Sequence, residues 1–217
     1  LPGGFNHYLQ SLRVVEKLEY EGKGLNLTFE VRDGISRHSK GRGKILDRKK
    51  EDLPATLEGQ IVRVSDIIGY VNHDIDDAIR AGIIKDADLP RHLAGILGRY
   101  PATRIDRMVV DVVDSSLKAG LERIAMSEEI TKAVVELREF LYERVYFDPS
   151  SREELRKTEK IIRDMFGYLM EHPEGYIKDY PAGDPLEKRV GDFIAGMTDR
   201  YALTLYEKTF FPRSWQS

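Results

Sequence analysis

The sequence has no cysteine among its 217 residues. This absence excludes a disulfide framework, a zinc–thiolate site and a cysteine nucleophile. Long apolar runs are missing as well, since no uncharged stretch approaches the roughly 18 residues that a membrane helix requires. We also find no basic segment followed by an apolar one that would indicate a secretory signal. These absences predict a cytoplasmic protein that has no membrane partner.

A large excess of either charge is also lacking. The chain carries 34 Lys and Arg against 37 Asp and Glu, a formal net charge of −3. This balance argues against a polybasic nucleic-acid arm as the dominant feature, although a local basic patch stays possible. Charged residues make up 33% of the chain, above the roughly 25% of an average domain. Such an excess is typical of long, solvated helices.

Helical periodicity dominates the pattern that is present. The strongest predicted helix runs from about Ala55 to Ile84, with Thr56 as its N-cap. We find no alternating strand of useful length, and the β-branched run Val109 to Val113 lies between helical flanks. The sequence therefore predicts an all-α fold. Further helices are predicted over residues 25–39, 90–98, 104–123, 127–146, 152–171, 186–197 and 198–210.

A polar stripe follows the long predicted helix. Its members stand at steps of three or four residues, which places them on one helix face: Arg63, Asp66, Tyr70, Asp74 and Asp77. Carboxylates on an otherwise apolar helix are costly to bury unless they are paired or coordinate a metal. Two interpretations follow. One is a cation or polar-substrate site, and the other is a set of salt bridges with Arg63 and Arg80.

These residues resemble a known family. The stretch from Leu57 to Asp66, continued through Asn72 to Ile79, is similar to the late helix of bacterial deoxyguanosine triphosphate triphosphohydrolases, members of the HD-domain superfamily. Four further matches follow in the expected order, at residues 3–13, 24–28, 137–146 and 196–202. The resemblance implies an HD-domain-type helical bundle with a C-terminal helical extension. It assigns residues 1–98 to the C-terminal portion of the catalytic core and 99–217 to the helical C-terminal region, together in one structural unit.

The resemblance covers the C-terminal half to two-thirds of such an enzyme. We therefore expect that a preceding part, with the family's first metal-binding His, its His–Asp doublet and its catalytic His and Glu, lies upstream of Leu1. Asp66 resembles the last metal ligand. The implied cofactor is a divalent metal, Mg or Mn, with Fe, Co, Ni or Zn also admitted by His ligands. We expect the isolated 217 residues to be inactive or nearly so.

The resemblance also implies contacts with a deoxynucleoside triphosphate. Tyr70 and Asp74 are similar to the pair that contacts the deoxyribose, with Asp74 on the 3′-hydroxyl. Arg37 and His38 are similar to the residues placed against the triphosphate. His7 resembles a His near the triphosphate, and Gln10 a polar residue that touches the sugar or base. The family commonly has Asn after this His, whereas this chain has Tyr8.

The implied reaction is hydrolysis of a deoxynucleoside triphosphate, with dGTP as the expected substrate, to the deoxynucleoside and tripolyphosphate. The family forms homo-oligomers, and we expect the same here. Three alternatives stay open: an HD phosphohydrolase that acts on another nucleotide, a non-catalytic nucleotide-binding or oligomerising helical module, and single-stranded nucleic-acid binding through the basic residues 37–50.

Overall fold

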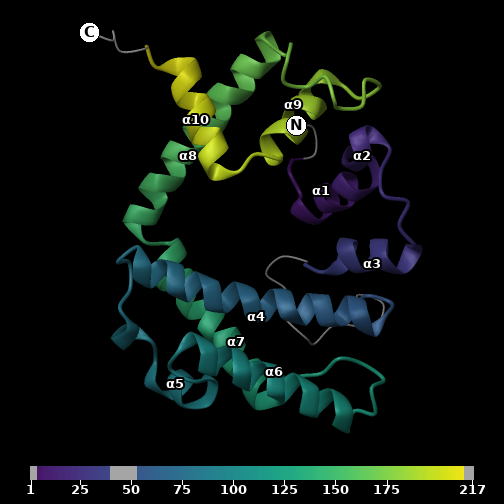
Figure 1. The fold of residues 1–217 in the computed structure, drawn as a ribbon. Helices are drawn as coiled ribbons and strands as arrows, with labels where there is room; N and C mark the ends of the chain where they lie inside the picture. Colours follow the sequence, from purple (N-terminus) through teal and green to yellow (C-terminus); the bar gives the residue numbers. More distant parts are fainter. Residues whose placement is uncertain (1–3, 40–52, 213–217) are drawn as a thin grey trace. The chain divides into compact units, whose positions relative to one another are not determined.

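The computed structural model describes residues 4–39 and 53–212. All regular secondary structure within these ranges is helical (Figure 1), so the prediction of an all-α fold is confirmed. No helix in the described part of the chain is both long and apolar enough to cross a membrane. The chain divides into two compact units. The first comprises residues 1–26 and 153–217, and the second comprises residues 27–152.

The first unit joins the two ends of the sequence. Its N-terminal part consists of α1 (His7–Arg13), the π-helical turn η1 (Val14–Leu18) and α2 (Glu19–Gly22). Its C-terminal part consists of most of α8 (Pro149–Glu171), followed by α9 (Leu186–Ala195) and α10 (Asp199–Phe210). A small apolar cluster around Leu169, Ile177 and Val190 forms the core of this unit.

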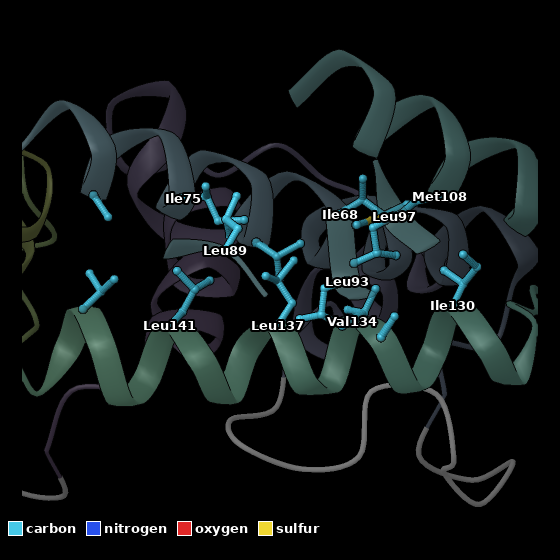
Figure 2. Close-up of a cluster of buried hydrophobic side chains, with 14 of the residues drawn as sticks. Ile68, Ile75, Leu89, Leu93, Leu97, Met108, Ile130, Val134, Leu137 and Leu141 are labelled. Atoms are coloured by element: carbon cyan, nitrogen blue, oxygen red, sulfur yellow. The ribbon is translucent and has the colours of Figure 1, made fainter. Parts of the chain in front are cut away.

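The second unit is built around one long helix. That helix is α4 (Leu57–Arg80), against which α3 (Phe29–Arg37), α6 (Pro101–Lys118) and α7 (Glu128–Leu141) pack. The unit also contains η3 (Asp86–Asp88), α5 (Arg91–Leu97), which packs with α6 and α7, and the π-helical turn η4 (Tyr142–Tyr146). Figure 2 shows α7 directing a row of side chains toward this core, including Val134, Leu137 and Leu141. These three are almost completely buried, together with Ile75 and Leu97.

The bounds of α4 follow from local chemistry. Thr56 caps its start, because the threonine Oγ1 accepts a hydrogen bond from the Gly59 amide at 3.1 Å. The helix ends at Arg80, before Gly82 adopts a left-handed φ of 72°. This turn is where a glycine most often stops a helix. The predicted cap is thus confirmed, whereas the predicted end at Ile84 is four residues too late.

The start of α4 and the helix α3 approach each other very closely. A Cβ atom added at Gly59 would lie 3.3 Å from the Gly34 Cα and only 2.7 Å from the Pro54 Cβ. Only glycine therefore fits at Gly59. Asn26 has a positive φ of 50°, and α3 begins after it at Phe29, which is later than the predicted residue 25.

The compact units do not follow the predicted division between residues 98 and 99. That boundary falls inside the second unit, between α5 and α6, whose side chains share one core. The units instead separate within α8, after Arg152. The predicted division concerned the extent of the HD-type core, and in that sense it stays a prediction.

Candidate functional site

The predicted site residues of the long helix lie on its solvent side. Asp66 and Tyr70 are exposed and Asp74 is half-buried, whereas Val64, Ile68 and other apolar neighbours face the core. The sequence analysis considered that these carboxylates would be costly to bury unless they were paired or coordinated a metal. In the structure they sit at the water-facing edge instead, where an ionised carboxylate is far less costly.

A chain of hydroxyl groups connects α4 to the end of α7. The Tyr146 hydroxyl donates to the Asp74 carboxylate. The Tyr70 and Tyr146 hydroxyl oxygens lie 2.6 Å apart. Because a phenol carries one proton and Tyr146 gives its own to Asp74, Tyr70 must donate to Tyr146. The carboxylate therefore stands at the accepting end of a directed chain.

Both phenols remain protonated at neutral pH. Burial raises the pKa of Tyr70 above its ordinary value, and the charge of Asp74 acts in the same direction. Burial also raises the pKa of Tyr146, and the hydrogen bonds to Asp74 and Tyr70 raise it further. A raised pKa favours the protonated phenol, so each hydroxyl keeps a hydrogen to donate.

Tyr146 is a site residue that the sequence analysis missed. It lies within one of the motifs quoted for the resemblance, but no role was assigned to it. The π-helical turn η4 carries Tyr142 and Tyr146, whose ring centroids are 5.1 Å apart. π-helical turns occur frequently at functional sites and change the direction of the side chains they carry. A regular 3.6-residue period, which is all that the sequence suggested, does not reveal such a turn.

Arg37 and His38 come at the end of α3, beside the first half of α4. The Arg37 Nε lies 2.6 Å from an oxygen of the buried Asp33. The other Asp33 oxygen accepts the Ala55 amide at 2.8 Å. Arg63 of α4 donates to the Arg37 carbonyl at 3.1 Å. The guanidinium of Arg37 is thus held in place at the edge of α4, with part of its charge balanced by Asp33.

The histidine that follows has a defined tautomer. The His38 Nδ1 lies 2.7 Å from the Ile35 carbonyl oxygen, which can only accept, so Nδ1 carries a hydrogen. Residues 40–50 were grouped with Arg37 and His38 as a basic segment in the sequence analysis. They lie outside the described residues.

The salt-bridge interpretation of the polar stripe is partly correct. Arg80 pairs with Asp77 at 3.3 Å, and both side chains are well exposed. Arg63, the other expected partner, donates a hydrogen bond to the backbone of α3. Asp74 accepts from a tyrosine. Asp74 and Asp77 therefore have partners among the described residues, and Asp66 is the carboxylate of the three that is best placed to bind a cation.

The described residues do not make a complete metal site. Across residues 4–39 and 53–212, no three His, Asp or Glu side chains come together as a metal-binding group. Asp66 fits one position in such a site, since a carboxylate oxygen suits Mg or Mn. One carboxylate does not hold a divalent metal firmly, so we derive no catalytic step through a metal from these residues.

His7 and Gln10 lie in the first unit, and their predicted contacts with the nucleotide stay predictions. The Gln10 Nε2 donates to the buried Asp192 at 2.8 Å. Since a carboxylate only accepts, the Gln10 amide is oriented with its nitrogen toward Asp192. A cavity of about 930 Å³ borders Gln10 and Asp192, and Tyr180 and Phe193 contribute to its lining.

Asp192 also holds Arg13, an ion pair that the sequence did not indicate. Two nitrogens of the buried Arg13 contact the Asp192 carboxylate at 2.6–3.0 Å, and Asp184 lies 2.6 Å from the same guanidinium. The hydrogen bond with Asp192 is the main reason that the pKa of Arg13 lies above its usual range. The Arg13 guanidinium likewise lowers the pKa of Asp184. These partners are more than 170 residues apart in the sequence, and no spacing rule reveals such pairs.

Comparisons with known proteins show what the chain is similar to. Residues 124–208 match the phosphohydrolase-associated domain. That stretch extends from before α7 into α10 and so includes Tyr146. This part of the chain is thus similar to the phosphohydrolase-associated domain.

Similar proteins narrow the class further. The chain is 45% identical to a deoxyguanosinetriphosphate triphosphohydrolase-like protein of Caldanaerobacter subterraneus subsp. tengcongensis, over 99% of this chain and 61% of that protein. It is 43% identical to proteins of the same name from Desulfatibacillum aliphaticivorans and Clostridium tetani, over 96% and 98% of this chain and 62% of each relative. The chain is therefore similar to dGTPase-like proteins, as the motifs predicted, and it spans somewhat less than two-thirds of the length of these relatives.

Proposed function

We propose that this chain is part of an enzyme that hydrolyses a deoxynucleoside triphosphate, with dGTP as the first candidate, to the deoxynucleoside and tripolyphosphate. One observation carries the proposal. Along α4, Arg37 lies beside Arg63, Asp66 follows one turn later, and Tyr70 and Asp74 come after it. The proposed substrate has its parts in the same order. The cation would meet the triphosphate, the Asp66 carboxylate would lie near the α-phosphorus, and the Tyr70–Asp74 pair would meet the sugar.

The length of α4 suits such a ligand. From Arg63 to Asp74 the helix rises by roughly 16 Å, at 1.5 Å per residue. That span is comparable to an extended nucleoside triphosphate without its base. Arg37 would bind the outer phosphates, because an oriented guanidinium donates to phosphate oxygens. His38 would join it by donating from Nε2 in the form of the ring in which both nitrogens carry a hydrogen.

At the other end, Asp74 would accept the 3′-hydroxyl of the sugar. One of its oxygens already accepts from Tyr146, so the sugar hydroxyl would use the remaining lone pairs or displace the phenol. The fixed direction of the Tyr70–Tyr146 chain keeps Asp74 an acceptor. Such an arrangement orients the sugar and thereby the phosphate chain attached to it.

Asp66 would be one ligand of a divalent metal, and a bound metal would supply an activated water and stabilise negative charge at the α-phosphorus. Because the described residues offer this single ligand, we expect the 217 residues alone to be inactive. We propose in addition that the protein self-associates, as expected from the resemblance.

The experiment measures dGTP hydrolysis with Mg²⁺ or Mn²⁺, both for this chain and for the chain extended by any sequence that precedes Leu1 in its reading frame. We expect activity only in an extended form, with tripolyphosphate as product. In that form Asp66→Ala should abolish turnover, and Asp74→Asn should raise KM for dGTP. Asp77→Asn is the matched control, because Asp77 lies on the same helix and pairs with Arg80.

Two results would contradict the proposal. The first is release of dGMP and pyrophosphate, and the second is full activity in the Asp66→Ala variant. A panel of other nucleoside triphosphates tests the alternative of an HD phosphohydrolase with another substrate. Nucleotide binding without hydrolysis in every form of the protein would favour a non-catalytic nucleotide-binding module, a candidate that the incomplete metal group in the described residues supports.

A further inference from the structure

A buried polar network joins α4 to α6. Arg104, near the start of α6, and Asn72, in the second half of α4, have exposed fractions of only 2% and 1%. The Arg104 Nε donates to the Asn72 Oδ1 at 2.9 Å, and the Arg104 Nη2 lies 3.5 Å from the Asp76 carboxylate. The Asn72 amide nitrogen donates in turn to the Ile68 carbonyl at 2.8 Å. The network thus contacts one face of α4 over about two turns.

The other end of the network is fixed to the turn before α6. The Arg104 Nη1 donates to the Arg99 carbonyl at 2.7 Å. Gly98, the preceding residue, has a φ of 103°, and a Cβ added there would lie 2.7 Å from the Thr103 Cγ2. Only glycine therefore fits in this turn, and its backbone is closely packed. Because Arg104 is held by that backbone, its guanidinium gives α4 a fixed point of reference.

Stability alone does not account for a guanidinium at this buried position. Burial lowers the pKa of Arg104, and this effect outweighs the charges of Asp76 and Asp86, which act in the opposite direction. Apolar residues of similar volume often stabilise a core as well as a buried ion pair does, or better. Hydrogen bonds differ from apolar contacts in that they require a narrow range of distances and angles. The network is therefore suited to fixing an orientation.

We propose that Arg104 is a positioning residue, which sets the rotation of α4 about its axis so that the hydroxyl chain to Asp74 can form. A helix turns about 100° per residue, so Asn72 lies about 160° around α4 from both Tyr70 and Asp74. Side-chain ends lie roughly 5–6 Å from a helix axis, so a rotation of about 15° moves them by about 1.5 Å. A shift of that size breaks the 2.6 Å contact between the hydroxyl groups of Tyr70 and Tyr146.

All of these residues belong to the second unit, from residue 27 to residue 152. The consequence for substrate binding rests on the function proposed above, in which Asp74 accepts the sugar hydroxyl. The orientation of α4 does not rest on it, and it can be measured in the 217-residue chain without any nucleotide.

The test variant is Arg104→Met, because methionine has a similar length and makes none of these hydrogen bonds. Tyrosine labelled with ¹³C at Cζ gives an NMR signal that reports ionisation, and comparison with Tyr146→Phe assigns the signal of Tyr146. In the parent we expect Tyr146 to ionise well above its ordinary pKa of about 10, and in Arg104→Met to ionise closer to that value. Loss of the Arg104 charge alone would have the opposite effect, since a nearby cation favours the phenolate.

A double variant separates positioning from stability. Arg104→Met leaves the Asn72 Oδ1 without the Arg104 donor, whereas Arg104→Met combined with Asn72→Leu replaces both partners by apolar groups, which is often nearly neutral. We expect the double variant to regain most of the lost stability in urea unfolding and to keep the lowered pKa of Tyr146. If the single variant does not fold, the double variant carries the titration.

Arg107→Met is the matched control. Arg107 lies on the same helix and donates to the Gly95 and Ile96 carbonyls of α5, so its loss removes an arginine of α6 that does not contact α4 in this way. Its Tyr146 should ionise as in the parent. In an extended form that hydrolyses dGTP, Arg104→Met should raise KM about fivefold with a smaller change in kcat, whereas Arg107→Met should change neither.

Two outcomes would overturn the proposal. The first is a Tyr146 that ionises in Arg104→Met as it does in the parent, or at a still higher pH. The second is a double variant in which the pKa of Tyr146 returns to that of the parent, because recovered stability would then suffice. If no extended form hydrolyses dGTP, the proposed function fails, while the NMR titration still decides the role of Arg104.

Discussion

At the scale of single residues, the candidate site depends on which group donates and which accepts. Asp74 was identifiable from the sequence, because it belongs to a stripe with steps of three and four residues. Its partner Tyr146 is 72 residues away, and nothing in the local pattern connects the two. Residue types and spacing thus indicated the residues that α4 contributes to the site. Tyr146, which η4 contributes, became apparent only from the structure.

The phenols give the folded chain a dependence on alkaline pH. Unfolded tyrosines ionise near pH 10, whereas burial raises the pKa of Tyr70 and Tyr146 in the fold. Above about pH 10 the unfolded chain therefore binds fewer protons than the native one. The free energy of unfolding then falls as pH rises, and the stabilisation is fully present below that pH.

We predict that Tyr146→Phe reduces this fall. Near pH 8 the variant should lose about 1 kcal/mol or less, because the hydroxyl chain is partly exposed. Above about pH 10 its stability should decline less steeply than that of the parent. Urea unfolding at several pH values measures both effects. Tyr100→Phe is the control, since Tyr100 is 64% exposed, and equal slopes for Tyr146→Phe and the parent would refute the assignment.

At the scale of elements, helix positions were largely predictable and helix ends were less so. The 3.6-residue period is a local property, and every long helix that it indicated is present. Ends depend on backbone conformations such as the positive φ at Asn26 and Gly82. The π-helical turns η1 and η4 were not predicted, because a 3.6-residue period carries no signal for them. Asp192, whose contacts are all tertiary, was missed for the same reason.

Two glycines on α4 provide a test of how closely α3 packs against α4. Gly59 has no room for a Cβ, because Pro54 would lie 2.7 Å from it. Gly69 lies ten residues later on the same helix and has no atom within 4 Å of its added Cβ. The two positions share one backbone conformation and differ in their surroundings.

We predict opposite signs for the two alanine variants. Gly59→Ala should destabilise the chain by about 1–3 kcal/mol, because overpacking moves α3 and Pro54 away. Gly69→Ala should stabilise it by about 0.5–1 kcal/mol, the usual preference of a helix for alanine. Chemical unfolding of both variants measures the difference. If Gly59→Ala were stabilising as well, the close approach of α3 to α4 would be wrong.

At the scale of the whole molecule, the first unit is discontinuous in sequence. Residues 1–26 and residues 153–217 belong to the same unit, although residues 27–152 separate them in the sequence. The buried ion pair between Arg13 and Asp192 connects these two segments, and Gln10 and Asp184 add further contacts to it. Removal of one partner from a buried pair leaves the other charge without compensation, which typically costs more than the pair contributes.

We predict that Asp192→Asn destabilises this unit selectively. A loss of about 3 kcal/mol is expected, at the lower end for buried pairs, because Asp184 still contacts Arg13. Such a loss corresponds to a rise on the order of a hundredfold in the population of the opened unit. Hydrogen exchange measured by mass spectrometry should show that residues 4–26 and 153–212 lose protection, whereas α4 to α7 keep theirs. Asp179→Asn, an exposed change in the same unit, should leave all regions unchanged. An equal loss in both units would mean that they unfold as one cooperative body, and the pair would then stabilise the entire chain.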